Sequence, residues 1–388
     1  MNKVYIAWAK RTPIGSFGGV FKDLSAIDLG VKVLLNFCAE YPKLKNRVSD
    51  LICGNVLSAG LGQAPAKQLV IKGGLDLQTQ ALSVNKVCSS SLAAIHLGFY
   101  FIATGRSDLV LAGGIESMSN APHLLSGLRF GLKVGSTQLI DHLQYDGLTN
   151  AFDGALMGSC CEEGAKSYSI GRDEQDEYAI LSYRRAIDAT QNGQFKNEIV
   201  PVSSNDRIID TDEEPTKFDQ EKLKKLKPAF KKDGTITAGN ASSLSDGACF
   251  VLLCSDKALQ AYDLNPLAEV VGLGWSATEP EKFFVAPVEA IKNACTNCGI
   301  KPLNLNVFEV NEAFSLVPLL VQKALNLPLD ILNVKGGAVS LGHPIGVSGA
   351  RIVTTLIYIM HEFNLARGVA AICNGGGEAL SVILKLCK

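Results

Sequence analysis

The sequence carries one strand–turn–helix–strand pattern twice, and this repeat limits the fold more than any other feature. In the first copy, residues 84–114 run from an apolar strand through a serine-rich turn into an apolar helix, then a second strand that ends on glycines. Residues 336–360 and 368–377 follow the same order. Ser89–Ser91 supply capping residues at the first helix start, and Ser348 holds the equivalent place in the second. A duplicated α/β unit is the simplest interpretation, and chance likeness is the alternative.

Short, almost entirely apolar runs alternate with helical patterns along the chain. Runs of this kind suit a parallel sheet that is covered on both faces, and strands alternating with helices predict an α/β fold in layers. Hydrophobic residues make up 47% of the chain and charged residues 19%, so a large core can form. The runs are residues 4–9, 50–57, 108–114, 306–314 and 368–377.

The middle of the chain, from about 119 to 240, has a different character. A loop-like segment at 131–138 is followed by a polar helical pattern at 171–188 and a lysine-rich stretch at 217–232. A solvated charged face is one interpretation of the lysines. A basic rim that attracts a phosphorylated ligand is the other.

Charge and cysteine content exclude several classes of protein. The formal net charge is −1, whereas a nucleic-acid-binding protein is usually basic. The 11 cysteines are scattered through a long chain, which indicates free thiols in a reducing compartment. Cys295 and Cys298 form one C-x-x-C without a second pair, so a structural role is favoured over a metal site.

The sequence predicts no association with membranes. The longest helical apolar stretch, residues 92–104, is too short to span a bilayer. Residues 1–9 show neither a signal peptide nor an Arg-rich presequence, so we expect a cytoplasmic location. A mitochondrial location is the alternative if a presequence has been removed.

Three residues are candidates for chemistry. Cys88 lies where an apolar strand meets a helix start, and backbone N–H groups at such a point favour a thiolate. His343 lies in a turn rich in glycine that leads into a helix, and such a turn can direct a side chain into a site. Cys373 precedes three glycines, whose N–H groups can face an oxyanion. Taken singly, each residue could also be structural.

Taken together, six ordered segments resemble the thiolase family over essentially the whole chain. The segments are NKVCSSSLAAI (85–95), GGIESMSNAP (113–122), AGNASSLSDGA (238–248), VNEAF (310–314), GGAVSLGHPIGVSGAR (336–351) and CNGGG (373–377). The resemblance implies a five-layered αβαβα fold with two similar halves and an inserted loop domain. It divides the chain into four parts. Residues 1–118 form the first part of the N-terminal half, and residues 119–239 form the coenzyme A-binding loop domain. Residues 240–265 complete the N-terminal half, and residues 266–388 form the C-terminal half.

The resemblance also implies the catalytic roles. Cys88 would be the nucleophile that takes the acyl group, and His343 the base that activates it. Cys373 would be the acid/base that exchanges a proton with the α-carbon of the second thioester. Asn311 would hold a water that forms one oxyanion hole with His343, and the N–H groups of Cys88 and Gly375 would form the other. No cofactor is required, because the coenzyme A esters are the substrates.

Further positions match the family's coenzyme A contacts. The matching residues are Met157, Lys217, Phe230, Ser242, Leu244, Ala313 and Phe314, with Lys217 as a phosphate partner. Four residues depart from the common pattern: Ser91 replaces glycine, Leu156 replaces histidine, Lys335 replaces asparagine and Asn374 replaces an apolar residue. Leu156 puts a polar contact to coenzyme A in doubt, and none of the four removes a catalytic group.

The resemblance predicts an acetyl-CoA C-acetyltransferase, which joins two acetyl-CoA into acetoacetyl-CoA and coenzyme A or reverses that reaction. Segments 113–122 and 146–160 look most like acetoacetyl-specific members, which predicts a four-carbon preference. The alternatives are a 3-ketoacyl-CoA thiolase of broader chain length, a ketoacyl synthase, and a silent acyl-CoA-binding homologue. The second cysteine argues against a synthase. The family suggests a homodimer or homotetramer.

A potassium site is a further expectation from the resemblance. Segments 174–186, 281–290 and 336–346 look like potassium-responsive acetoacetyl-CoA thiolases. The ligands would be the Tyr183 hydroxyl and the carbonyls of Ala238, Gly239 and Val339, all neutral oxygens. Gly239 stands where alanine is usual, and Phe284 stands where those enzymes have proline, so a 2-methyl-branched substrate is doubtful. The alternative is that Tyr183 only packs beneath the loop domain.

Overall fold

The computed structural model describes residues 2–387, and its strands form two halves with the same topology. In the first half the strand order is β1-β10-β5-β3-β4, in which β3 is parallel to β4 and β5, and β10 is antiparallel to β1 and β5. The strands are β1 (Val4–Arg11), β3 (Asp50–Gly54), β4 (Gln80–Val84), β5 (Leu109–Ser117) and β10 (Ser245–Ser255).

The second half repeats this order as β11-β14-β13-β12. β14 is antiparallel to β11 and β13, β12 is parallel to β13, and Leu332 adds a parallel bridge to Phe308 where β4 would lie. The duplicated unit read from the sequence is therefore confirmed. The strands are β11 (Ala268–Ala277), β12 (Val307–Val310), β13 (Arg367–Asn374) and β14 (Glu378–Leu386).

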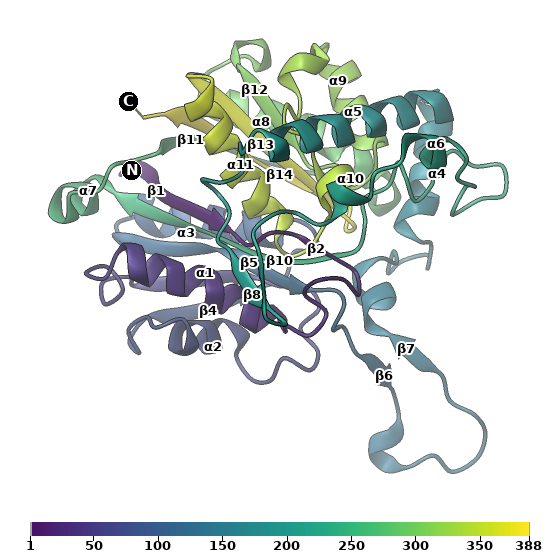
Figure 1. Cartoon of the computed structure of the whole chain (residues 1–388), viewed down its shortest axis with the longest axis horizontal. Helices are drawn as coiled ribbons and strands as arrows, with labels where there is room; N and C mark the ends of the chain where they lie inside the picture. The colour runs from purple at the N-terminus through teal and green to yellow at the C-terminus, as the bar shows by residue number, and fades with distance from the viewer. Residues whose placement is uncertain (1, 388) are drawn as a thin grey trace.

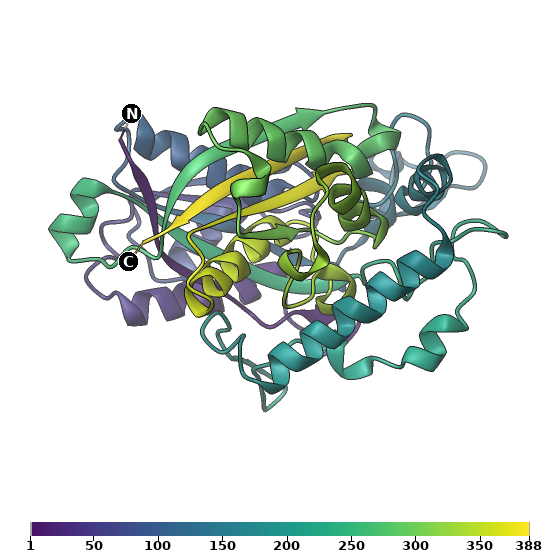
Figure 2. The same ribbon diagram turned by 90° about the horizontal axis from the view of Figure 1, so that it is seen from above.

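The halves meet where β1 pairs with β11 through Tyr5 with Glu269 and Ile6 with Ala268. This contact and the short strand β2 (Gly15–Ser16) complete one 10-stranded sheet that folds over two central helices. These helices, α3 (Ser90–Ala103) and α11 (Ser348–Glu362), pack against each other and against strands of both halves (Figures 1 and 2). α3 is apolar on almost every side, as expected for a helix between two sheets.

Other helices cover the outer faces of the sheets. α1 packs on β10 and β5, and α8 packs on β11 and β14, which gives the predicted αβαβα layers. Ser25 and Asp28 form a capping box that begins α1. The outer helices are α1 (Ala26–Glu40) and α2 (Pro65–Lys72) on the first half, and α8 (Ala286–Asn297) and α9 (Leu316–Leu325) on the second.

The segment between β5 and β10 contains the residues predicted as an insertion, 119–239. A hairpin of β6 and β7 projects from the body of the molecule, whereas α5 runs along the side of that body (Figures 1 and 2). The exact domain boundaries stay a prediction. The elements here are β6 (His123–Leu125), η1 (Leu128–Phe130), β7 (Leu139–Asp141), η2 (Leu143–Gly147), α4 (Met157–Ser167), α5 (Arg172–Gln191), β8 (Val202–Ser204), β9 (Arg207–Ile209), η3 (Glu214–Lys217) and α6 (Gln220–Lys224).

Short helices complete the connections. They are α7 (Asp256–Tyr262), η4 (Pro280–Val285), η5 (Pro302–Asn304), η6 (Leu329–Ile331) and α10 (Ala338–Leu341). Among residues 2–387, no helix is both long and apolar enough to cross a bilayer.

Candidate active site

Cys88 lies in the tight turn that leads from β4 into α3. The preceding residue, Val87, has a φ of 48°, which is a strained conformation for a β-branched side chain. Ser90 holds this turn, because its Oγ accepts from the Lys86 N–H at 2.8 Å and donates to the Val87 carbonyl at 2.6 Å. The strain fixes the direction in which the Cys88 thiol points.

His343 lies between α10 and α11, and its backbone N–H donates to the Ser243 carbonyl at 3.1 Å. The preceding Gly342 has a φ of 106°, and a Cβ there would lie 2.3 Å from Ser245 Oγ, so only glycine fits. Nδ1 of His343 lies 2.6 Å from Ser348 Oγ, and that hydroxyl donates to the Pro344 carbonyl at 3.1 Å. Nδ1 is therefore the donor, which leaves Nε2 free to accept a proton.

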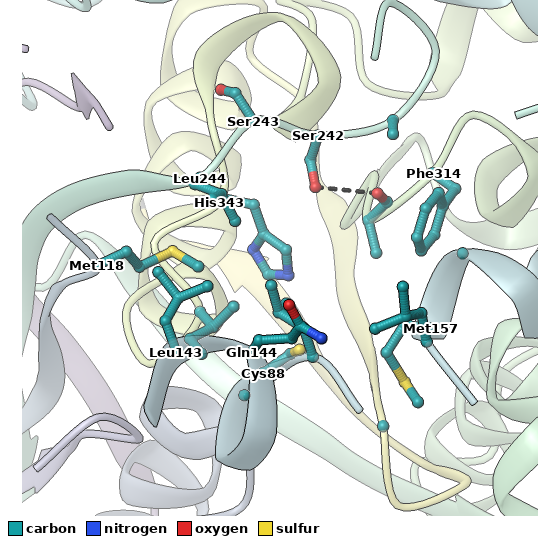
Figure 3. Close-up of a pocket in the computed structure, with 18 of the residues that line it drawn as sticks. Cys88, Met118, Leu143, Gln144, Met157, Ser242, Ser243, Leu244, Phe314 and His343 are labelled. Atoms are coloured by element: carbon teal, nitrogen blue, oxygen red, sulfur yellow. Dashed lines mark hydrogen bonds between the residues drawn. The ribbon is translucent and has the colours of Figure 1, made fainter. Parts of the chain in front are cut away.

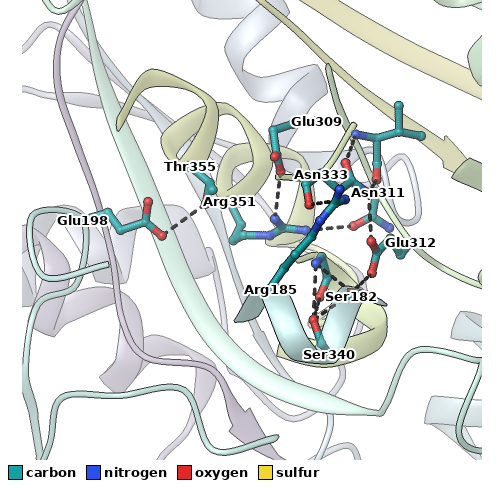
Figure 4. Close-up of polar contacts among 12 residues, drawn as sticks. Ser182, Arg185, Glu198, Glu309, Asn311, Glu312, Asn333, Ser340, Arg351 and Thr355 are labelled. Atoms are coloured by element: carbon teal, nitrogen blue, oxygen red, sulfur yellow. Dashed lines mark hydrogen bonds and ion pairs between the residues drawn. The ribbon is translucent and has the colours of Figure 1, made fainter. Parts of the chain in front are cut away.

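Asn311 follows β12 and contacts the free nitrogen of this histidine. Its Nδ2 lies 3.4 Å from His343 Nε2, and its Oδ1 lies 3.5 Å from Nη2 of Arg351. Arg351 is 1% exposed and also lies 3.5 Å from a carboxylate oxygen of Glu309 (Figure 4). Because a guanidinium can only donate, Arg351 fixes which end of the Asn311 amide faces His343.

Cys373 is the second-to-last residue of β13, and a turn of glycines joins it to β14. Gly377 has a φ of 81°, and a Cβ there would lie 2.5 Å from the Thr278 carbonyl oxygen, so the turn depends on glycine. Within this turn, Gly375 lines the same cavity as Cys88, and its N–H lowers the pKa of the Cys88 thiol. The turn that carries one cysteine thus places a donor near the other.

These residues surround one cavity of about 450 Å³. In Figure 3, Leu244 and Leu143 lie on one side of the His343 ring, and Phe314 and Met157 lie on the other. Of the predicted site residues, Cys88, Met157, Phe230, Ser242, Leu244, Ala313, Phe314, His343, Cys373 and Gly375 line this cavity. Asn311 lies behind His343, as its contact shows.

Lys217 is not among the lining residues. Its ammonium forms ion pairs with Glu213 at 3.1 Å and Glu214 at 3.6 Å. Its role as a phosphate partner stays a prediction. Sequence reasoning also missed lining residues, chiefly Phe17, Met118, Leu143, Gln144, Leu148, Phe283 and Ile345. Met118 and Ile345 lie in segments that carried the resemblance, but an apolar side chain has no chemical signal that assigns it to a cavity, so only the fold could place these residues here.

Burial controls the protonation of the three reactive groups. It raises the pKa of Cys88 to about 12, and the N–H groups of Cys88 and Gly375 offset only part of this effect. Burial also lowers the pKa of His343 to about 3, with a smaller effect from Arg351. The pKa of Cys373 is raised by burial and by the neighbouring Cys88. The N–H groups therefore favour the thiolate, as expected, but burial outweighs them, so that a thiol beside a neutral imidazole is the resting form.

The wall opposite the cysteines is shaped by hydrogen bonds and aromatic contacts. Ser242 Oγ donates to the Ala313 carbonyl at 2.9 Å, which joins the segment before β10 to the one after β12 (Figure 3). Phe230 meets Phe314 edge to face, with ring centroids 6.2 Å apart. An apolar channel with few polar groups leads from this wall to the reactive groups.

Three of the four predicted potassium ligands, Tyr183, Gly239 and Val339, lie around one buried cluster, whereas Ala238 is exposed. Tyr183 and Val339 share a cluster with Leu223, and a Cβ on Gly239 would lie 2.7 Å from Leu223. The Tyr183 ring also stacks on Phe218, with centroids 4.6 Å apart, as the packing alternative expected. Burial raises the pKa of Tyr183, and the charges of Glu214 and Glu312 add to the shift. A potassium ion at this place stays a prediction.

Two family models cover nearly the whole chain. "Thiolase, N-terminal domain" matches residues 4–257, and "Thiolase, C-terminal domain" matches residues 264–386. The chain belongs to the thiolase family. Like other thiolases it is an acyltransferase, and the fold expected from the sequence is confirmed.

Relatives and solved structures agree with this assignment. The "Probable acetyl-CoA acyltransferase" of Staphylococcus aureus strain COL is 43% identical to this thiolase, over 100% of both chains. The Acat5 thiolase of Ascaris suum, solved with coenzyme A, is 43% identical, with a TM-score of 0.94 over 99% of this chain and 100% of that one. Human mitochondrial 3-ketoacyl-CoA thiolase, also solved with coenzyme A, is 36% identical, with a TM-score of 0.96 over 100% and 98%.

Proposed function

We propose that this thiolase is an acetyl-CoA C-acetyltransferase, which condenses two acetyl-CoA to acetoacetyl-CoA and coenzyme A and catalyses the reverse thiolysis. The observation that carries the proposal is that Cys88, His343 and Cys373 line one cavity, with Asn311 behind the histidine. The A. suum thiolase was solved with coenzyme A, which supports coenzyme A esters as the substrates.

In the first half-reaction, Nε2 of His343 takes the Cys88 proton as the sulfur attacks the acetyl carbonyl. The N–H groups of Cys88 and Gly375 face the developing oxyanion. Loss of the coenzyme A thiolate leaves acetyl-Cys88, and Cys373 gives its proton to the departing thiolate. A neutral His343 is needed for the first transfer, in agreement with its lowered pKa.

In the second half-reaction, the Cys373 thiolate removes a proton from the methyl group of another acetyl-CoA. The enolate oxygen lies toward protonated His343 and a water held by Asn311, and the enolate carbon attacks the carbonyl of acetyl-Cys88. The Cys88 thiolate then leaves and recovers its proton from His343. Cys88 thus regains the proton that it gave to His343. Cys373 replaces the proton that left with coenzyme A by the one that it took from the α-carbon.

A four-carbon preference is part of the proposal. Cys88 packs against a buried apolar cluster of Val56, Leu57, Met118, Leu143 and Ile345. Of these side chains, Met118, Leu143 and Ile345 also line the cavity. An acyl group on Cys88 would lie against them, and a longer chain would have to displace them. The likeness to human 3-ketoacyl-CoA thiolase favours a second candidate, a thiolase of broader chain length.

Thiolysis separates the candidates. The purified protein is mixed with coenzyme A and either acetoacetyl-CoA or an eight-carbon 3-ketoacyl-CoA, and the loss of each ketoester is followed. Rapid loss of acetoacetyl-CoA alone supports the proposal, and equal rates support the broader enzyme. Loss of neither supports a silent homologue, and Cys88→Ser serves as the inactive control.

A further inference from the structure

The side chain of Asn374 joins the two segments that carry the reactive cysteines. Its Nδ2 donates to Ser89 Oγ at 3.2 Å, and its Oδ1 accepts from the Gly376 N–H at 3.0 Å. Asn374 follows Cys373, and Ser89 follows Cys88. Both side chains are buried, so water cannot readily replace the bond between them. An apolar residue, as is common in the family, could not make these contacts.

Gly375 lies in the chain between Asn374 and Gly376, whose N–H the Asn374 side chain accepts from. Gly375 lines the cavity together with Cys88, and its N–H lowers the pKa of the Cys88 thiol, whereas Gly376 beside it is exposed. Consecutive glycines have wide conformational freedom, so an N–H in such a turn keeps its direction only if other contacts hold it. The Asn374 side chain holds the turn at Gly376 and anchors it to the nucleophile segment at Ser89.

We propose that Asn374 is a positioning residue, whose amide keeps the Gly375 N–H aimed at the Cys88 sulfur. An N–H held in this direction favours the Cys88 thiolate over the thiol. In acyl transfer the same donor faces the oxyanion. The inference rests on the proposed function only in that Cys88 is the nucleophile.

A second contact crosses between the same segments and provides a control. Lys86 Nζ lies 2.6 Å from Glu378 Oε2, but both side chains are about one-third exposed. Ion pairs with this much exposure to water contribute little. Glu378→Gln therefore removes a contact between the segments without changing the bridge through Asn374.

The experiment measures alkylation of Cys88 by iodoacetamide as a function of pH, followed on the Cys88 peptide by mass spectrometry. Asn374→Ala and Ser89→Ala both remove the hydrogen bond between the two side chains, so either variant suffices if the other fails to fold. Asn374→Ala also removes the contact to Gly376, and Ser89→Ala also removes a 3.4 Å hydrogen bond to the Ile372 carbonyl. We expect both to react at least about threefold more slowly than the parent at each pH, because the thiolate loses a donor. The double variant should be no slower than the slower single variant, and Glu378→Gln should match the parent.

An unchanged rate in a folded single variant, multiplicative slowing in the double variant, or equal slowing in Glu378→Gln would overturn the inference. Thermal unfolding shows which variants are folded. Acetylation of the parent by acetyl-CoA is measured in parallel. A parent that is not acetylated contradicts the proposed function, whereas the alkylation rates still test the role of Asn374.

Discussion

Nδ2 of Asn311 lies 3.4 Å from Nε2 of His343, and Arg351 holds the other end of the same amide at 3.5 Å. The amide therefore presents its donor to the nitrogen that serves as the base. Figure 4 shows that Arg351 in turn lies beside Glu309, and both side chains are buried. A buried residue outside the cavity lining thus sets the direction of the amide that contacts His343.

Asn311→Ala should slow condensation far more than acetylation. The loss of one oxyanion donor typically lowers kcat by about 10²- to 10³-fold, and here the donor serves the enolate step. Acetylation uses the N–H groups of Cys88 and Gly375 and should change less than about tenfold. Stopped-flow acetylation and steady-state condensation measure the two steps. The matched control is Asn306→Ala, which changes an exposed residue before β12. Equal losses in both steps for Asn311→Ala would contradict the role assigned to Asn311.

The pH dependence of Cys88 reactivity follows from its raised pKa. Because the pKa is about 12, the thiolate fraction of the resting enzyme should rise about tenfold per pH unit between about pH 7 and 9. A cysteine paired with imidazolium would instead react at a constant rate over that range. Alkylation of the Cys88 peptide by iodoacetamide distinguishes the two, and a plateau below about pH 8 would show that the resting enzyme holds an ion pair.

Much of the fold and part of the site could be predicted from the sequence. The repeat of strand and helix predicted the two halves, because apolar patterns are local and survive in the sequence. The segment of Cys88 could be picked out by its place between a strand and a helix start, those of His343 and Cys373 by their glycines, and all three by resemblance. The bridge from Asn374 to Ser89 joins residues 285 positions apart, and no local pattern announces such a contact.

Two expectations depended on surroundings that local sequence does not encode. The position of Cys88 just before a helix favoured a thiolate, but the apolar residues that bury it come from distant segments and raise its pKa. Lys217 was assigned to a phosphate from the lysine-rich stretch, yet the carboxylates of Glu213 and Glu214 lie one helical turn away and pair with it. Its role toward coenzyme A stays a prediction.

Leu143→Ala should broaden the substrate range. Leu143 lines the cavity and belongs to the apolar cluster beside Cys88. Its truncation makes room for added methylenes, each of which gains roughly 0.8 kcal/mol when buried. The ratio of kcat/KM for six-carbon over four-carbon ketoacyl-CoA should therefore rise by about tenfold. Leu139→Ala, which removes an exposed leucine from the same segment, should leave the ratio unchanged. An unchanged ratio in Leu143→Ala would place the acyl group elsewhere.

Potassium should raise the activity through the cluster around Tyr183. A cation there would join α5 to α10, whose Val339 lies four residues before His343. Rates are compared in equal concentrations of potassium chloride and sodium chloride, for the parent and for Tyr183→Phe. We expect a higher rate in potassium for the parent and a smaller difference for the variant. Identical parent rates in both salts would exclude the site.

The most direct test of the account is the position of the acetyl group. The parent, Cys88→Ser and Cys373→Ser are incubated with acetyl-CoA, and peptides are mapped by mass spectrometry. The account predicts acetyl-Cys88 in the parent and in Cys373→Ser, no adduct in Cys88→Ser, and condensation in the parent alone. An acetyl group on Cys373 of the parent, with none on Cys88, would contradict it.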